Sequence, residues 1–271
     1  MAAVAVLNTE SRAVTGSTRN SPLVTADPWV VSSSTPPADG CEPKTMIEAV
    51  LWDVDDTLFD FSGSDRLALL RHFEAEGLPS GEATFERWWQ VTGIAHERLA
   101  AGELTYKEYQ RERARGLAGR SLSEAEADAW FGRYIALFEA AWTVFPDVRG
   151  TLEALPFRQG ILSNSSTEHQ ERRMSALGLR HHFEVLLCSD RLGCAKPDPS
   201  AFLAGCAALD LPPAVVAYIG DRLDTDAIGA RDAGLFGIWL DRGHTSVQVP
   251  DGVYRIADLV ELPQLLASLG G

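Results

Sequence analysis

The stretch that decides the fold is residues 47–58, IEAVLWDVDDTL, in which a short apolar run leads straight into three acidic residues. Side chains alternate between the two faces of an extended chain, so we expect Asp53 and Asp55 to project to one side while Val54 points to the core. Two neighbouring carboxylates repel each other unless a cation lies between them or one of them holds a proton. The stretch by itself fits either a solvated acidic turn or a chemical site, which would hold a divalent metal or pair a nucleophile with a general acid.

The composition narrows the class of protein. The 271 residues predict one large domain or a core with a smaller insert, and no apolar stretch approaches the ~20 residues of a membrane span. The formal net charge of −14 argues against a nucleic acid as partner, because such binding depends on clustered Lys and Arg. An acidic protein that acts on anions needs a local positive charge, such as a metal ion.

The cysteines indicate a reducing environment. They lack the close pairs of a zinc site and are too few to frame a small secreted scaffold. We therefore predict free thiols and a cytoplasmic protein. The residues concerned are Cys41, Cys188, Cys194 and Cys206.

Residues 1–45 differ from the rest of the chain, because Ser, Thr, Pro and Ala dominate and no hydrophobic period persists. They lack the basic start and long apolar centre of a secretory signal. We predict a disordered, dispensable extension, with Met46 as an alternative natural start.

The rest of the chain shows two different hydrophobic patterns. Residues 62–142 show apolar side chains at three- and four-residue spacing, interrupted by glycine-rich turns at 77–81 and 116–119, which predicts three or four helices. After Pro146, apolar runs alternate with amphipathic segments, which predicts a parallel, doubly wound sheet with flanking helices. The expected strands are residues 159–163, 185–188, 215–219 and 236–240.

The predicted architecture is thus a Rossmann-like α/β core, residues 46–61 and 143–271, with a helical insert at 62–142. Two helix starts are marked by capping patterns. Residues 165–168, SSTE, resemble a capping box, and Asp198 followed by Pro199 is an N-cap with a first-turn proline.

In such sheets ligands bind at the carboxyl ends of the strands. There, Ser163 and Asn164 precede a helix start that favours an anion, although both are also ordinary capping residues. Lys196 also lies in this part of the sequence, but an isolated lysine is usually only solvated. Asp221 and Asp226 follow another strand and can bracket a cation or a lysine, or simply enrich a helix start in acid.

Taken together and in this order, these residues resemble the motifs of the haloacid dehalogenase-like hydrolase superfamily. The resemblance spans residues 46 to 245, and the helical insert looks like the helical cap domain of that family. The residues that carry it are Asp53-Val54-Asp55-Asp56-Thr57, Ser163, Lys196 before Pro197-Asp198-Pro199, Gly220-Asp221 and Asp226.

The resemblance implies phosphoryl transfer through an aspartyl-phosphate with Mg²⁺ as cofactor. Asp53 would attack phosphorus, and Asp55 would protonate the leaving oxygen and then activate water. Ser163, Asn164 and Lys196 would bind the phosphoryl oxygens.

The implied metal ligands are Asp53, Asp221 and the backbone carbonyl of Asp55. Asp226 would orient Lys196 or a metal-bound water, with Asp224 as an alternative for that role.

Asp55 favours a phosphatase, because dehalogenases of this superfamily lack an acid two residues after the nucleophile. Residues 57–61, TLFDF, look like those of pyrimidine 5′-nucleotidases and similar phosphatases of small metabolites. The expected substrate is a nucleoside 5′-monophosphate or a sugar phosphate. A phosphosugar mutase, and less so a dehalogenase or a non-catalytic binding protein, stay as alternatives, and a monomer and a homodimer are both compatible with the sequence.

Two features of the insert have competing interpretations. Trp88 and Trp89 suggest a stacking platform for a ring, but adjacent helical positions point in different directions, so at least one should be core. The basic run at residues 107–115 contains Glu108 and Glu112 at helical pairing distance, which predicts a solvated, salt-bridged face.

Overall fold

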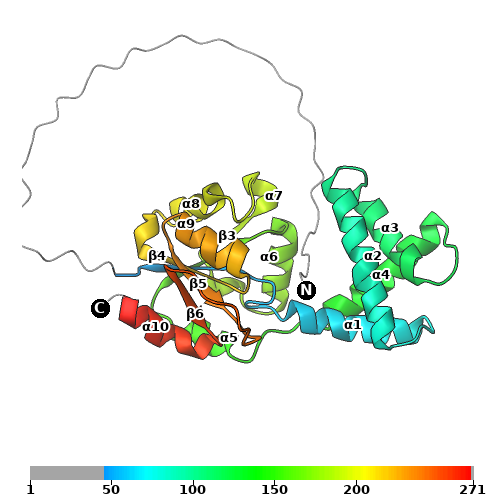
Figure 1. Cartoon of the computed structure of the whole chain (residues 1–271), viewed down its shortest axis with the longest axis horizontal. Coiled ribbons are helices and arrows are strands. Elements are labelled where there is room, and N and C mark those ends of the chain that lie inside the picture. Colours follow the sequence, from blue (N-terminus) through cyan, green and yellow to red (C-terminus); the bar gives the residue numbers. More distant parts are fainter. Residues whose placement is uncertain (1–45, 270–271) are drawn as a thin grey trace, which may run out of the picture.

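The computed structural model describes residues 46–269 (Figure 1), so the predicted extension at residues 1–45 lies outside the described residues. The core is a six-stranded, fully parallel sheet in the order β3-β2-β1-β4-β5-β6. The predicted α/β, doubly wound fold is confirmed. The strands are β1 (Ala49–Trp52), β2 (Arg158–Ser163), β3 (Val185–Cys188), β4 (Val216–Gly220), β5 (Phe236–Leu240) and β6 (Val253–Ile256).

The central strands are apolar on both faces, as a parallel sheet covered on both sides requires. Along β1, Leu51 packs with the cluster that includes Phe202 of helix α8, whereas Trp52 packs with the cluster that includes Leu152 of helix α5. In Figure 1, α8 and α9 lie on the opposite side of the sheet from α5 and α10. The core helices are α5 (Val148–Ala154), α6 (Thr167–Ala176), α7 (Ser189–Leu192), α8 (Pro199–Ala208), α9 (Gly229–Asp232) and α10 (Leu262–Leu269).

The strand order positions the site. The chain builds β2 and β3 on one side of β1 and then crosses to place β4 on the other side. Ligands of open α/β sheets bind at such a reversal, outside the carboxyl ends of the strands. The loops after β1 and β4 therefore start as neighbours, and Asp53 N donates to Ile219 O at 2.9 Å.

Between β1 and β2, the chain forms four insert helices, which lie beside the sheet (Figure 1), before the core helix α5. They pack around a shared aromatic core that includes Phe73, Phe85, Trp130 and Phe131. Capping boxes begin two of them, at Thr105 with Glu108 and at Ser123 with Glu126. The helices are α1 (Phe61–Ala75), α2 (Glu82–Ala100), α3 (Tyr106–Leu117) and α4 (Glu124–Ala140).

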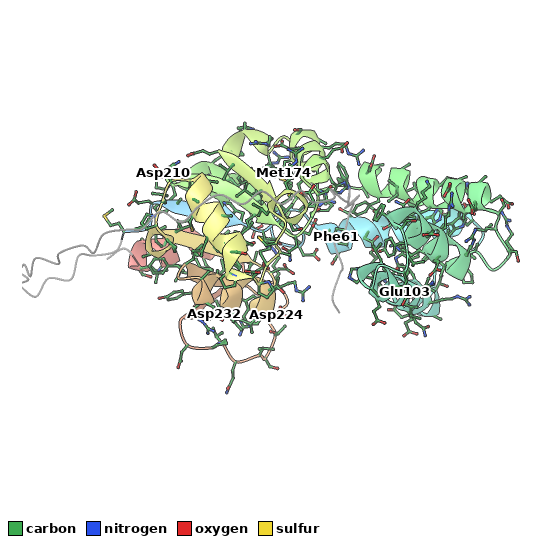
Figure 2. The ribbon with its side chains drawn as sticks, turned by 90° about the horizontal axis from the view of Figure 1, so that it is seen from above. Phe61, Glu103, Met174, Asp210, Asp224 and Asp232 are labelled. Atoms are coloured by element: carbon green, nitrogen blue, oxygen red, sulfur yellow. The ribbon has the colours of Figure 1, made fainter. Side chains whose placement is uncertain are left out.

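The two linkers that join the insert to the core run side by side. Asp60 N donates to Thr143 O at 3.1 Å, and Phe145 N donates to Leu58 O at 3.4 Å. Figure 2 marks Phe61, the first residue of α1, between the sheet and the other insert helices. The insert is thus connected to the loop that carries Asp53 and Asp55 by only a few residues.

The expectation that at least one of Trp88 and Trp89 is a core residue is confirmed. Trp88 is fully buried in the core of the insert, where its ring lies 5.0 Å from that of Tyr134. Trp89 is partly buried and packs against the same cluster. Both rings are therefore occupied in stabilising the helices.

The basic run of α3 is salt-bridged as predicted, but its partners lie on other helices and one of its arginines is buried. Its ion pairs connect to neighbouring helices, with Arg111 donating to Asp128 of α4 at 2.8 Å. Arg113 is buried: its guanidinium lies 4.3 Å from the centre of the Trp88 ring and donates to Thr92 Oγ1 at 3.0 Å. Helix spacing alone could not reveal these contacts with α2 and α4.

Other differences are local. Strand β6 was not predicted from the sequence, because it is an edge strand whose Tyr254 and Arg255 interrupt the apolar pattern. Helix α6 is capped by Ser166, whose hydroxyl accepts from His169 N, so the predicted capping box with Glu168 does not form. Asp198 caps α8 as predicted.

Two sequence-based expectations concern chemistry outside the site. Within residues 46–269, no helix combines the length and the hydrophobicity that a membrane crossing requires. Cys188, Cys194 and Cys206 are free thiols, and Cys41 lies outside the described residues.

Gly237 of β5 provides a test of this packing. A Cβ there would lie 2.0 Å from Ala227 O, a backbone atom that cannot rotate away. We expect Gly237→Ala to lower the free energy of unfolding by about 3 kcal/mol in urea denaturation. Gly150→Ala on α5, where a Cβ meets nothing within 4 Å, should leave stability unchanged or slightly raised. Equal stability of the two variants would contradict this packing.

Candidate active site

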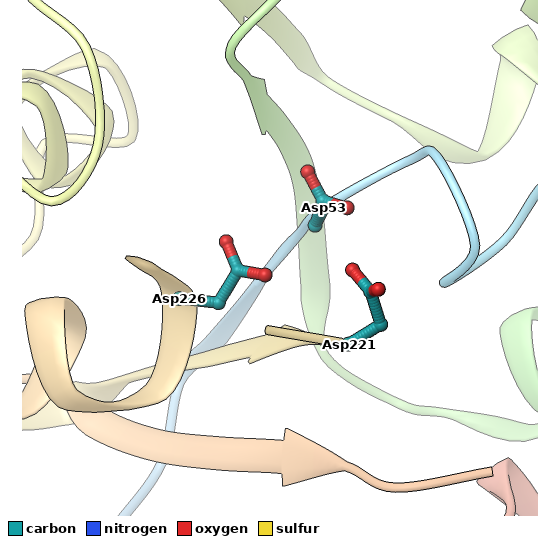
Figure 3. A group of neighbouring side chains, drawn as sticks. All are labelled: Asp53, Asp221 and Asp226. Carbon is teal, nitrogen blue, oxygen red and sulfur yellow. The ribbon is translucent and has the colours of Figure 1, made fainter. Parts of the chain in front are cut away.

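Three carboxylates meet where β1 and β4 end (Figure 3). Asp53 follows β1, Asp221 follows β4, and Asp226 lies on the short π-helical turn η3 (Leu223–Ile228). One oxygen from each lies within 4.8 Å of the others. The sequence-predicted Asp53, Asp221 and Asp226 are therefore brought together, although 168 residues separate the first from the second.

A buried ammonium group joins two of these carboxylates. Lys196 Nζ donates to Asp53 Oδ1 and to Asp226 Oδ1, both at 2.7 Å, and to the hydroxyl oxygen of Tyr218 at 2.5 Å. Burial alone would lower the pKa of Lys196, but the charges of Asp226 and Asp53 raise it well above its usual value. Lys196 therefore stays cationic and offers a fixed positive charge beside Asp53.

Asp226 is held as a partner for Lys196. Its Oδ2 accepts from Arg222 N at 3.0 Å. The carboxylate lies over Gly220, where a Cβ would come within 2.4 Å of Asp226 Cγ, so only glycine fits there. The alternative role for Asp224 is wrong, because its side chain is 75% exposed and pairs with Arg222; Figure 2 labels it on the outside of the core.

The carboxylate of Asp221 accepts no hydrogen bond from any residue in the described range 46–269, although its backbone is fixed on both sides. Asp221 N donates to Thr57 Oγ1 at 3.0 Å, and its carbonyl accepts from Trp239 Nε1 at 2.9 Å. Burial, with the nearby charges of Asp53 and Asp226, raises the pKa of Asp221 to about 9. A cation beside this carboxylate would relieve that cost.

Asp53 is similarly crowded. Burial, opposed by the Lys196 ammonium, raises the pKa of Asp53 to about 7. Its Oδ2 accepts a 3.3 Å hydrogen bond from Thr57, whose hydroxyl thus bridges Asp53 and the backbone of Asp221. Oxygen donors from Asp53 and Asp221 are the ligands that Mg²⁺ prefers, so these residues fit the predicted metal.

Asp55 has different partners from Asp53. The strand ends at Trp52, and Asp56 adopts a left-handed conformation with φ of 58°, which turns the loop after Asp55. The carboxylate of Asp55 is ion-paired with Arg173 and accepts from Gln170 Nε2 at 3.2 Å, both on α6. It therefore lies outside the acidic cluster, although its charge contributes to raising the pKa of Asp53.

Ser163 and Asn164 differ in availability. Ser163 Oγ at the end of β2 accepts from Gln170 Nε2 at 3.2 Å and keeps its own proton for a substrate oxygen. The amide of Asn164 instead pairs in both directions with the backbone of Lys196, at 2.8 Å each. The phosphate contact predicted for Asn164 is thus not available to its side chain, which positions Lys196.

Four residues that contact the site residues had no predicted role in the site: Thr57, Gln170, Arg173 and Tyr218. Gln170 and Arg173 stand three residues apart, so they share a helix face, and both are fully buried. Polar residues on the buried face of a helix were a signal that could have revealed them.

The chain is similar to known proteins over the region that contains these site residues. A family model for haloacid dehalogenase-like hydrolases matches residues 47–234. The chain is 29% identical to the glyceraldehyde 3-phosphate phosphatase of Methanopyrus kandleri, over 73% of this chain and 85% of that protein. It is 31% identical to the phosphoserine phosphatase of Thermus thermophilus (63% and 67%) and 28% identical to the pyrimidine 5′-nucleotidase YjjG of Escherichia coli (80% and 96%).

Solved structures share the architecture. A HAD hydrolase of Bacillus subtilis, YfnB, crystallised with magnesium, superposes with a TM-score of 0.67 at 24% identity, covering 82% of this chain and 99% of that one. A 2-haloacid dehalogenase of Pseudomonas syringae pv. tomato gives a TM-score of 0.60 at 27% identity, with coverages of 82% and 99%. The fold is thus common to proteins of different chemistry.

The raised pKa of Asp221 generates a test of the metal site. A carboxyl whose folded pKa is raised destabilises the fold increasingly as pH rises above its unfolded value of 3.8 and up to its folded value of about 9. We expect Asp221→Asn, without metal, to raise Tm by about 2–4 °C at pH 8 and by less at pH 5.

Added Mg²⁺ should stabilise the wild-type protein and leave Asp221→Asn unchanged in the same thermal scans. Equal stabilisation of both proteins would place the ion elsewhere.

Proposed function

Because the chain belongs to the haloacid dehalogenase-like hydrolases, whose family model matches residues 47–234, we propose that it hydrolyses the phosphoester of a small phosphorylated metabolite. The family predicted from the sequence motifs is confirmed. Three relatives are named for phosphatase or nucleotidase activity on such compounds, which supports this substrate class. The proposal includes the cytoplasmic location predicted from the cysteines.

One observation carries the proposal: a carboxylate two residues after Asp53 is held in place by two side chains of α6. Asp55 Oδ2 accepts from Gln170 Nε2, the same nitrogen that donates to Ser163 Oγ, at 3.2 Å in each case. This bridge places a group that can transfer a proton next to a group that can bind a phosphoryl oxygen. A halide leaves without a proton, so a dehalogenase would gain nothing from this arrangement.

In the proposed reaction, Asp53 Oδ attacks phosphorus and the bond from phosphorus to the ester oxygen breaks. Asp55, in its protonated form, gives its proton to that oxygen as the alcohol departs, leaving a phosphoryl group on Asp53 and an ionised Asp55 paired with Arg173. Asp55 then takes a proton from water, which attacks the phosphoryl group and releases inorganic phosphate. Both carboxyl groups return to their starting state.

Charge on the transferred phosphoryl group needs compensation. The ammonium of Lys196 lies 2.7 Å from Asp53 Oδ1, so an oxygen of the group on Asp53 would lie close to it. The hydroxyl of Ser163 would donate to another oxygen. Tyr218 and Asp226 keep Lys196 at that place by accepting hydrogen bonds from its ammonium group.

The proposed Mg²⁺ ligands are Asp53, Asp221 and the backbone carbonyl of Asp55, while Asp226 is engaged with Lys196. When bound, Mg²⁺ would neutralise negative charge on the nucleophile and on the substrate. The carboxylate of Asp221 accepts no hydrogen bond from residues 46–269, which supports its role as a ligand of such an ion.

A panel of substrates tests the function. Release of inorganic phosphate would be measured from nucleoside 5′-monophosphates, sugar phosphates and short phosphorylated acids, with Mg²⁺ or with a chelator, and halide release from 2-haloacids in parallel. We expect phosphate release that requires Mg²⁺ and is abolished by Asp53→Asn. Halide release without phosphate release would overturn the proposal, and interconversion of sugar phosphates without net phosphate release would favour a mutase.

The two acids should fail at different stages. With p-nitrophenyl phosphate, Asp55→Asn should still form the phosphorylated enzyme, because p-nitrophenolate leaves without a proton, but should hydrolyse it about 10²-fold or more slowly. Stopped-flow absorbance should therefore show a burst of p-nitrophenol close to the enzyme concentration. Asp53→Asn should show neither burst nor turnover. An Asp55→Asn variant that turns over alkyl phosphates at the wild-type rate would contradict the role of Asp55.

A further inference from the structure

The acid-base residue of the proposed reaction is attached to α6 through two side chains. Arg173 is ion-paired with Asp55 Oδ1, and Gln170 Nε2 donates to Asp55 Oδ2 at 3.2 Å. Gln170 Oε1 accepts from Arg173 at 3.3 Å, so the two helix residues also hold each other. Both carboxylate oxygens of Asp55 therefore have a fixed partner, and the plane of the carboxylate is set by α6.

Arg173 is unusual in its burial. Its side chain is 1% exposed, and that of Asp55 is 14% exposed. A guanidinium stays charged, so it can be buried only with a charged partner and further contacts. Its other nitrogen, Nη2, contacts His169 Nε2. Burial, with the charges of Arg173 and Arg172, lowers the pKa of His169 to about 3, so His169 is neutral and its Nε2 can accept.

The remaining contacts of Arg173 come from the insert and its linkers. The guanidinium carbon lies 4.2 Å from the centre of the Phe59 ring, on the first linker, and 5.4 Å from that of Trp142, on the second. Phe138 of α4 lies 6.0 Å away on the same scale. Such cation-π contacts attract the guanidinium electrostatically. Rings from both connections to the insert thus surround the group that holds Asp55.

We propose that Arg173 is a positioning residue that fixes the carboxylate of Asp55 for proton transfer and makes its orientation depend on where the linkers place the helical insert. The proposal rests on the proposed function. The one anionic contact of Arg173 within residues 46–269 is Asp55, so its charge is already paired with the acid-base residue. A displacement of Phe59 or Trp142 would move the guanidinium, and the ion pair would carry the displacement to Asp55.

Three variants test this role. Arg173→Met keeps the length and the apolar contacts but removes the charge, Arg173→Lys keeps the charge, and Arg180→Met is the control. Arg180 follows α6, is partly exposed and pairs with Glu171 of that helix.

With an alkyl phosphate, we expect Arg173→Met to lower kcat about tenfold or more while KM changes less than about twofold, because Lys196 and Ser163 still bind the phosphoryl group. Arg173→Lys should recover part of kcat, and Arg180→Met should match the wild-type protein. An Arg173→Met loss that appears in KM, or an equal loss in Arg180→Met, would overturn the proposal.

A double-mutant cycle with Asp55 separates a positioning role from a structural one. If Arg173 acts through Asp55, Arg173→Met should cause no further loss of burst rate with p-nitrophenyl phosphate in an Asp55→Asn background. In thermal unfolding, the double variant should be more stable than Asp55→Asn alone, because it removes an unpaired buried charge. Additive losses in both readouts would show that Arg173 acts independently of Asp55.

Two further measurements keep the test decisive. If Arg173→Met does not fold, Gln170→Leu removes the contact to Asp55 Oδ2 without leaving a buried charge and should lower kcat in the same way; wild-type kcat in that variant would overturn the proposal. If the wild-type protein releases no phosphate from any substrate, the proposed function fails, whereas the coupling in thermal unfolding still reports whether Arg173 holds Asp55.

Discussion

The ammonium group of Lys196 lies where the ends of β1 and β4 meet the segment before α8, and it donates to Asp53 and Asp226 at 2.7 Å each. Without this charge, the carboxylates gathered there would repel one another in a buried setting. Asn164 and Tyr218 fix the lysine at its two ends, one at the backbone and the other at the ammonium. The acidic cluster is therefore stable because a cation has been built into it, and its remaining free carboxylate, Asp221, faces the place where a metal is expected.

Around that charge, the two aspartates of the first loop have separate environments. Asp53 is ion-paired with Lys196 within the acidic cluster, whereas Asp55 is ion-paired with Arg173 of α6. A nucleophile must stay ionised and close to the phosphoryl group, and an acid-base group must lie near the leaving oxygen. The left-handed conformation of Asp56 turns the chain just after these two residues, toward the first linker. The same short loop therefore carries the proposed nucleophile and acid-base residue and connects the core to the insert.

Much of this could be predicted from local patterns. Four of the five strands after β1, the cap at Asp198, and the order of the acidic, hydroxyl and lysine residues all follow from short sequence segments. These features succeed because apolar runs and capping chemistry act over a few residues. β6 was missed because an edge strand carries polar residues, and Arg113 was misjudged because its partners lie on other helices.

The sequence by itself determined the fold class and the family, because the residues that define them sit at strand ends in a fixed order. Only the tertiary structure decided which carboxylate meets which cation: Asp53 meets Lys196, and Asp55 meets Arg173, 118 residues further along the chain. It also assigned Asn164 to the backbone of Lys196 rather than to a ligand. The physical reason is that a buried charge pairs with the opposite charge nearest to it in space. Which charges are near each other is fixed only when the strands and α6 pack together.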